Sequence, residues 1–287
     1  MKLDDEQESS NVEDRRGGGM GRAGGIGIGT IAIALIASYF LGIDPSTVLN
    51  VAQQVQGPAT VQPERPLDPA NDPEAALKTE VRKVLHKTET SWHAIFREMN
   101  AQYREPTLVL YSGRTPTACG AGDAAMGPFY CPGDQKVYLD MAFFREMEQR
   151  FRAGGDFARA YVIAHEIGHH VQNVIGITGE TEKMRQRLSE KEYNRVSVKV
   201  ELQADCFAGV WAHHANRAKP FLDPNDVDEA LRAANAIGDD MLQKQARGVV
   251  VPDSFTHGSS AQRVRWFKTG FETGTLRSCD TFAARDL

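Results

Sequence analysis

The sequence lacks an excess of positive charge. Its 33 Lys and Arg residues are outnumbered by 38 Asp and Glu residues, which gives a formal net charge of −5. A protein that binds the phosphate backbone of nucleic acid presents a basic surface, and this composition offers none. With 41% hydrophobic and 25% charged residues, the chain is an ordinary globular one with room for one good-sized domain. We therefore expect no nucleic-acid partner.

Long hydrophobic runs are also scarce, and the conspicuous one extends without a charge from Ala23 to Ile43. As a helix it would span roughly 32 Å, against about 30 Å for the hydrocarbon core of a membrane. Basic residues precede it, whereas the next one after it is Arg65. This asymmetry predicts a single transmembrane helix with a cytoplasmic N-terminus and an extracytoplasmic, periplasmic remainder. The alternative is a cleaved signal peptide, but the run is long for one and no clear small-x-small cleavage site follows.

The segments on either side of residues 23–43 look unlike a folded domain. Residues 1–22 are acidic and then glycine-rich, with few apolar side chains to bury, which predicts a disordered cytoplasmic tail. Residues 44–71 are punctuated by prolines and read as an extended stalk. The folded domain is expected to cover residues 72–287.

Cysteine is scarce too, with Cys119, Cys131, Cys206 and Cys279 in the whole chain. In an extracytoplasmic domain four cysteines indicate disulfides, and three pairings are possible. Cys119 and Cys131 bracket a glycine-rich segment, so we favour that pair and the pair Cys206–Cys279. The competing idea makes Cys206 a zinc ligand.

The most informative motif is His-Glu-x-x-His, formed by His165, Glu166 and His169 in a stretch that reads as helix. Residues four apart lie on one face of a helix, so both imidazoles can reach one metal ion. Two neutral imidazoles suit zinc, and the glutamate between them is placed to act as general base on a zinc-bound water. The motif predicts a zinc peptidase with one Zn²⁺ per chain.

A second helical stretch supplies further ligands, since Glu201 and Asp205 are again four residues apart. Glu201 would complete a set of two histidines and one glutamate, leaving a fourth position for water. Asp205 would accept the distal N–H of a ligand histidine, most simply that of His165. The alternatives are two solvated acids, or Asp205 as the ligand and Glu201 as a bystander. Apolar neighbours argue against solvated acids, because a carboxylate in a buried helix needs a partner.

Periodicity predicts an α+β fold in which a small sheet leads into a helical body. Its expected elements are a long helix over residues 72–100, strands over 107–111 and 136–139, a weaker edge strand over 124–130, and helices over 156–176, 180–217 with a possible break, 226–246 and 260–270. His86 and His93 fall in the first helix and are not expected to be ligands.

These motifs together resemble two groups of known proteins. A sheet before the His-Glu-x-x-His helix and a Glu-x-x-x-Asp helix after it look like the glutamate-zincin architecture. The blocks GPFYCPGDQKVYLD, AYVIAHEIGHHVQNVIG, ELQADCFAGVW and THGSSAQRVRWFKTGF more closely resemble the bacterial neutral zinc metallopeptidase family, whose members are membrane-anchored. The resemblance implies a zincin fold, zinc and a peptide or protein substrate.

His257 is the candidate for the donor that, with zinc, holds the oxyanion. Its segment Thr-His-Gly-Ser-Ser-x-x-Arg resembles the Thr/Ser-His-Pro segment of membrane peptidases that also carry Glu-x-x-Ala-Asp, although Gly258 departs from that pattern. The competing interpretation is that His257 merely precedes a helix that starts at Ser259 or Ser260. Lesser catalytic candidates are Tyr193, His213 and His214, and His170 is expected to pack behind the site.

Two other functions remain open at this stage. A zincin-like scaffold could bind partners outside the membrane without catalysis, although such a protein need not keep Glu166. Alternatively, the same zinc chemistry could hydrolyse a non-peptide amide, such as one in cell-wall material.

Overall fold

The computed structural model describes residues 1–17, 71–124 and 127–287. The expected membrane segment, residues 23–43, and all but the last residue of the expected stalk lie outside this part of the chain. Within it, no helix has both the length and the apolar character needed to cross a membrane. Residues 1–14 and 72–287 fold into one compact unit of the expected α+β class.

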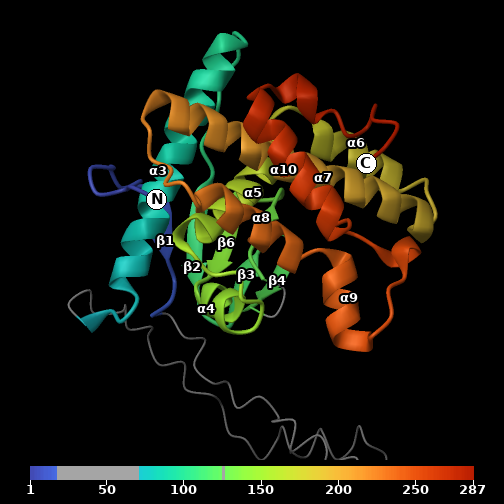
Figure 1. Cartoon of the computed structure of the whole chain (residues 1–287), viewed down its shortest axis with the longest axis horizontal. Coiled ribbons are helices and arrows are strands. Elements are labelled where there is room, and N and C mark those ends of the chain that lie inside the picture. Colours follow the sequence, from blue (N-terminus) through green and yellow to red (C-terminus); the bar gives the residue numbers. More distant parts are fainter. Residues whose placement is uncertain (18–70, 125–126) are drawn as a thin grey trace, which may run out of the picture. The chain divides into compact units, whose positions relative to one another are not determined.

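A four-stranded mixed sheet forms one side of this unit, in the order β1-β2-β6-β5. Its strands are β1 (Val12–Asp14), β2 (Thr107–Tyr111), β5 (Phe129–Cys131) and β6 (Lys136–Asp140). β1, β2 and β6 lie side by side (Figure 1) and run parallel, with Leu108 opposite Val137. β5 is an antiparallel edge strand. The predicted inner strands are confirmed, and the edge strand, expected over 124–130, covers Phe129–Cys131.

Both faces of the two inner strands are covered. Leu108, Leu110, Val137 and Leu139 belong to the main core, while Val109, Tyr111 and Tyr138 form a smaller cluster on the opposite face. Strands buried on both faces are apolar throughout, which is why these segments stand out in the sequence. A separate hairpin of β3 (Arg114–Thr117) and β4 (Gly120–Asp123) was not predicted, because its strands are short and polar.

The expectation of a disordered tail is wrong for residues 1–14. Val12 pairs with Leu108 in the parallel register of β1 and β2, and the Met1 ammonium lies 2.6 Å from the Asp156 carboxylate. The segment also runs along α3 (Ala75–Glu98), where Lys83 Nζ donates to the carbonyl oxygen of Leu3 (Figure 1). Tertiary hydrogen bonds and ion pairs hold this segment, so its low apolar content did not reveal that it is ordered.

Ser9 shows how closely the N-terminal segment is held. Its side chain is buried, its backbone N–H donates to the carbonyl oxygen of Arg82, and its own carbonyl accepts from Arg82 Nε. The Ser9 hydroxyl donates to Glu89 Oε1 at 2.7 Å, and the same oxygen accepts from Asn11 Nδ2 at 2.9 Å. The buried Glu89 carboxylate therefore depends on the first residues of the chain for its hydrogen bonds.

The helical body follows the sheet and agrees with the periodicity. Its helices are α4 (Ala142–Gln149), α5 (Asp156–Val174), α6 (Ile177–Arg185), α7 (Glu190–Ala218), α8 (Asp226–Ala236), α9 (Asp239–Arg247) and α10 (Ser260–Thr273). The break expected within 180–217 is confirmed, since α7 starts anew at a capping box on Ser189. Residues 226–246, expected as one helix, are divided at Gly238 into α8 and α9.

Three glycines allow the helices of the site to approach closely. A Cβ at Gly168 of α5 would lie 2.9 Å from the Ala204 carbonyl oxygen of α7. Where α7 crosses α10, a Cβ at Gly209 would lie 2.1 Å from the Phe267 oxygen, and one at Gly270 would lie 1.9 Å from the Cys206 oxygen. Any side chain at these positions would force the helices apart and separate the residues that they carry.

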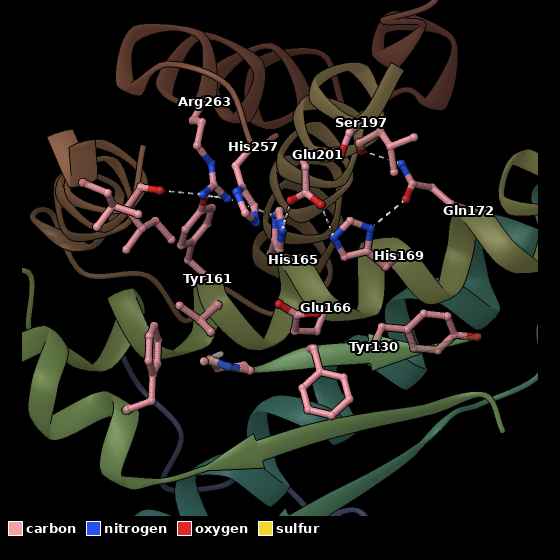
Figure 2. Close-up of a pocket in the computed structure, with 18 of the residues that line it drawn as sticks. Tyr130, Tyr161, His165, Glu166, His169, Gln172, Ser197, Glu201, His257 and Arg263 are labelled. Carbon is pink, nitrogen blue, oxygen red and sulfur yellow. Dashed lines mark hydrogen bonds and ion pairs between the residues drawn. The ribbon is translucent and has the colours of Figure 1, made fainter. Parts of the chain in front are cut away.

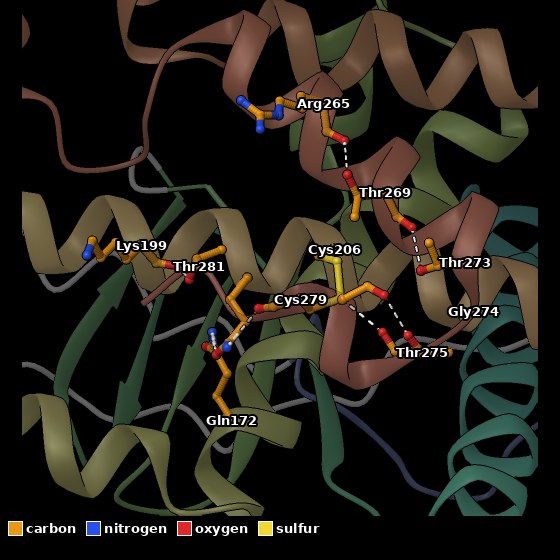
Figure 3. Close-up of a disulfide and its surroundings, with 12 residues drawn as sticks. Gln172, Lys199, Cys206, Arg265, Thr269, Thr273, Gly274, Thr275, Cys279 and Thr281 are labelled. Carbon is orange, nitrogen blue, oxygen red and sulfur yellow. Dashed lines mark hydrogen bonds between the residues drawn. A yellow bond between two sulfur atoms is a disulfide. The ribbon is translucent and has the colours of Figure 1, made fainter. Parts of the chain in front are cut away.

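Two disulfides match the predicted pairing. Cys119 bonds to Cys131 and thereby ties the β3–β4 turn to β5, and Cys206 bonds to Cys279. The second bond fastens the short helix η4 (Leu276–Cys279) to the middle of α7, beside contacts made by Gln172 and Thr281 (Figure 3). Cys206 is therefore unavailable as a zinc ligand.

A pair of adjacent serines tests whether the N-terminal segment is part of the fold. We expect Ser9→Ala to lower the free energy of unfolding by roughly 1–2 kcal/mol, because it removes a hydrogen bond to the buried carboxylate of Glu89. Ser10 is exposed, so Ser10→Ala should change the free energy of unfolding by less than about 0.5 kcal/mol. Urea unfolding of the full chain measures both. Equal, negligible effects would show that the segment does not contribute to stability.

Candidate active site

Helix α5 presents the His-Glu-x-x-His motif to a cleft. The helix is buried along most of its length, and His165 and His169 occupy one face one turn apart, as the spacing predicted. A cleft of about 850 Å³ opens over this face and is lined by both histidines and by Glu166. Tyr130 of β5 and Glu201 of α7 line it as well, so the sheet edge and the second helix meet here.

The structure brings together the three residues expected to bind the metal. One ligand atom from each of His165, His169 and Glu201 lies within 4.8 Å of the others. Nε2 of His165 lies 3.2 Å from Glu201 Oε2, and Nε2 of His169 lies 3.5 Å from Glu201 Oε1 (Figure 2). Each ring thus directs its Nε2 atom towards the Glu201 carboxylate.

The other nitrogen of each ring is engaged on the side away from Glu201. His165 Nδ1 lies 2.8 Å from Asp205 Oδ1, and His169 Nδ1 lies 2.9 Å from Gln172 Oε1. Each acceptor favours a proton on Nδ1, which leaves Nε2 free to bind a metal. Asp205 therefore occupies the position that the spacing predicted. Gln172 was not predicted, although it is one turn from His169 on the same helix.

Asp205 is fully buried and is shared by three partners. Nε and Nη2 of Arg263 each donate to it at 2.9 Å, one to each oxygen, and the Tyr161 hydroxyl donates to Oδ1 at 2.5 Å. Burial opposes ionisation, but the charges of Arg263 and His165 hold the pKa of Asp205 down at about 2. With both oxygens engaged behind His165, Asp205 cannot also face the metal position, which argues against the alternative in which it replaces Glu201 as ligand.

Arg263 and Tyr161 are further residues of the site that the sequence did not single out. Arg263 comes from α10 and Tyr161 lies one turn before His165 on α5. The Arg263 Nη2 atom also donates to the Tyr161 hydroxyl at 3.2 Å, so α5, α7 and α10 meet in one hydrogen-bonded cluster. The Arg of the Thr-His-Gly-Ser-Ser-x-x-Arg segment was the available signal, but its partner is distant in sequence.

The carboxylates shift the pKa values of the two histidines. Burial lowers the pKa of His165, yet Asp205 and Glu201 outweigh it and raise the pKa to about 10. At His169 burial is likewise opposed by Glu201, and the pKa is raised. Burial raises the pKa of Glu201, but His169 and His257 hold it well below its usual range. The raised pKa values of the two histidines favour positively charged rings beside Glu201. A divalent cation would displace protons from these rings when it binds.

His257 lies on the wall of the cleft opposite α5, near Glu201 (Figure 2). Its side chain is 51% exposed, and its Nδ1 lies 3.3 Å from Asp239 Oδ1. Burial lowers the pKa of His257, but Glu201 and Asp239 outweigh it and raise the pKa. The N-cap of α10 is Ser259, so His257 precedes the helix start and also faces the cleft; the two interpretations are compatible.

The remaining candidates have other contacts. His213 and His214 lie within hydrogen-bond distance of the backbone oxygens of Phe271 and Gly274, and Tyr193 lines the cleft with its ring 5.4 Å from the Arg185 guanidinium. His170 of α5 is buried, as expected, between the Tyr130 hydroxyl and the Arg104 carbonyl oxygen. His86 and His93 lie beside Glu89 and Glu105, apart from the cluster of possible metal ligands.

Comparison with known proteins gives a consistent result. The model of the family described as "putative neutral zinc metallopeptidase" matches residues 1–282. The uncharacterized protein YpfJ of Escherichia coli strain K12 is 46% identical over 98% of this chain and 99% of its own length. The uncharacterized proteins Mb2605 of Mycobacterium bovis and Rv2575 of Mycobacterium tuberculosis are each 39% identical over 87% of this chain and 86% of their own. No solved structure matches the chain.

The family match includes the N-terminal segment as well as the cleft residues, because it begins at residue 1. It confirms the resemblance that the four sequence blocks indicated. The chain belongs to the neutral zinc metallopeptidase family.

Proposed function

We propose that this chain is a zinc metallopeptidase that hydrolyses peptide bonds, with one zinc ion held by His165, His169 and Glu201. The observation that carries the proposal is the convergence of both Nε2 atoms on the Glu201 carboxylate while both Nδ1 atoms are engaged elsewhere. Two imidazole nitrogens and one carboxylate are the donor set of many catalytic zinc sites, with a further position left for water. The residues present therefore fit the metal.

In the proposed mechanism Glu166 transfers a proton and His257 donates a hydrogen bond. Bound zinc would supply Lewis acidity, which lowers the pKa of a coordinated water and polarises the substrate carbonyl. The Glu166 carboxylate accepts a proton from the water as the water oxygen bonds to the carbonyl carbon. Glu166 then donates that proton to the amine nitrogen as the carbon–nitrogen bond breaks. His257 donates a hydrogen bond from Nε2 to the substrate oxygen, where negative charge develops.

The position of β5 supports an extended peptide as substrate. Phe129 and Tyr130 of this edge strand line the same cleft as Glu166, and β5 pairs with β6 along its other side. An edge strand can bind an extended chain through backbone hydrogen bonds. A sheet edge beside a His-Glu-x-x-His helix is also the reason that we propose a zincin-like fold. The position of β5 favours a peptide over a non-peptide amide, because a non-peptide amide lacks the backbone needed to pair with this edge strand.

We also propose that residues 23–43 attach the protein to a membrane and that the folded unit lies outside the cytoplasm. The two disulfides support an oxidising compartment. Because β1 pairs with β2, residues 1–14 and 72–287 must lie on the same side of any membrane. A single crossing between them would separate the two strands. We therefore place the N-terminus outside as well, in contrast to the orientation that the flanking basic residues favour.

Adjacent histidines test the metal assignment. His169→Ala removes one of the proposed ligands, so we expect the purified protein to lose most of its zinc. His170→Ala is the matched control, because the His170 ring contacts Tyr130 and Arg104 and does not face Glu201. Metal analysis should give about one zinc per chain for the wild type and for folded His170→Ala protein. Similar zinc loss in both variants would refute the ligand assignment.

Glu166→Gln separates an enzyme from a scaffold. The amide keeps the size of the side chain but has no useful basicity, so turnover of a peptide library should fall by roughly 10²- to 10⁴-fold. Zinc content and Tm should stay near the wild-type values, because Glu166 is not one of the proposed ligands. If the variant cleaved at the wild-type rate, the mechanism would be wrong. A wild-type protein that binds zinc and cleaves no peptide would favour a scaffold or a non-peptide amide as substrate.

Surface labelling tests whether the two ends of the folded unit share a compartment. Ser10 and Lys268 are exposed, and all four native cysteines are in disulfides, so Ser10→Cys or Lys268→Cys introduces one reactive thiol. We expect a membrane-impermeant maleimide to label both variants in intact cells whose outer barrier is permeable to it. Labelling of Lys268→Cys in intact cells, with labelling of Ser10→Cys only after lysis, would restore the single-crossing orientation.

A further inference from the structure

One carboxylate accepts several hydrogen bonds from the loop that carries His257. Asp239, the first residue of α9, accepts at Oδ2 from the backbone N–H groups of Thr256, His257 and Gly258, at 2.7, 2.6 and 3.0 Å. Its other oxygen, Oδ1, lies 3.3 Å from His257 Nδ1. We infer that Asp239 is a positioning residue for His257, fixing both the backbone and the ring so that Nε2 is directed into the cleft. The inference rests on the proposed function of His257.

The conformation of the loop calls for a hydrogen-bond acceptor at this position. Three successive N–H groups point to one side, and Gly258 has a φ of 93°, in the left-handed region that favours glycine. Such a concave set of N–H donors is a favourable site for a negatively charged acceptor. Asp239 supplies that charge, and its own N–H donates back to the Gly258 oxygen at 3.0 Å. The loop and the first residue of α9 therefore fix each other.

Asp239 is in turn held against the helix that carries Arg263. The next residue, Asp240, accepts at Oδ1 from the Ser260 N–H at 2.7 Å and from the Ser260 hydroxyl at 2.6 Å. Gly238 packs so closely that a Cβ there would lie 2.5 Å from the Ser260 nitrogen. These contacts hold the start of α9 against the start of α10. Because α10 follows directly after the His257 loop, they also limit how far the loop can move.

The contacts at Nδ1 determine which nitrogen faces the substrate. Thr256 Oγ1 at 3.0 Å and Asp239 Oδ1 at 3.3 Å can both accept a hydrogen bond from an N–H at Nδ1. These contacts hold the ring by its Nδ1 side and leave Nε2 on the side of the cleft. Figure 2 shows the His257 ring beside Glu201 on the side of Arg263. The ring is thus placed beside the proposed metal position before substrate binds.

Imidazole NMR of the ¹⁵N-histidine-labelled full chain tests this inference without any assay of activity. The His257 signals are identified by their loss in His257→Ala. In the wild type we expect Nδ1 of His257 to carry a proton. In Asp239→Asn the amide oxygen replaces Oδ2 towards the three N–H groups, so its NH₂ group faces Nδ1 and Nδ1 should lose its proton. Asp240→Asn is the matched control, because Asp240 contacts Ser260 and not the ring, and it should leave the His257 signals unchanged.

Kinetics add a second readout if the wild type cleaves peptides. Asp239→Asn should lower kcat by about 10-fold or more with zinc content unchanged, because the ring loses the carboxylate that holds it at Nδ1. The double variant Asp239→Asn/His257→Ala should be no slower than His257→Ala alone, since Asp239 acts through the ring. A bare Nδ1 in the wild type, unchanged His257 signals in Asp239→Asn, or additive losses in kcat would each overturn the inference. If the wild type cleaves nothing, the proposed function fails and the NMR result still decides the role of Asp239.

Discussion

Asp205 carries a negative charge in the interior with none of its surface exposed, and the arrangement of the site depends on how that charge is compensated. Arg263 neutralises it through two hydrogen bonds, and His165 and Tyr161 use the remaining capacity of Oδ1. Removing one partner of such a buried pair typically costs about 3–5 kcal/mol, because the other charge is left uncompensated. The same carboxylate favours the Nδ1 proton of His165. The contacts that pack the three helices together therefore also orient the proposed metal ligand.

Close helix packing makes this compensation possible. Gly168 lets α5 approach the backbone of α7, and Gly209 and Gly270 do the same between α7 and α10. The disulfide from Cys206 lies beside Asp205 in sequence and fixes the chain that follows α10 to the same helix. Rigid helices, and not mobile loops, therefore hold His165, His169 and Glu201. The exception is His257, whose loop gains its order from the carboxylate of Asp239.

The sequence predicts those parts of the site whose geometry is local. Spacing of four residues placed His165 with His169, and Glu201 with Asp205, on helical faces, and the apolar strands at 107–111 and 136–140 were recognisable because both faces are buried. Contacts between segments that are distant in sequence produce no local pattern and could not be predicted. Arg263 and Asp239 resemble ordinary charged residues until α10 and α9 are folded against α7 and the His257 loop. The N-terminal segment was misjudged for the same reason, since Ser9 and Asn11 are held by Glu89 and not by an apolar core.

The pairing of β1 with β2 also bears on the order in which the protein folds. Val12 meets Leu108, and the Met1 ammonium meets Asp156 and Asp226, so the partners of the first residues leave the ribosome long after those residues do. Contacts between such distant segments form slowly, because a long loop must close before they stabilise anything. Until β1 arrives, β2 presents an open edge to any other extended chain. The segment that is synthesised first is thus expected to be among the last to fold, and any factor that delays it prolongs the time during which the sheet is open to mispairing.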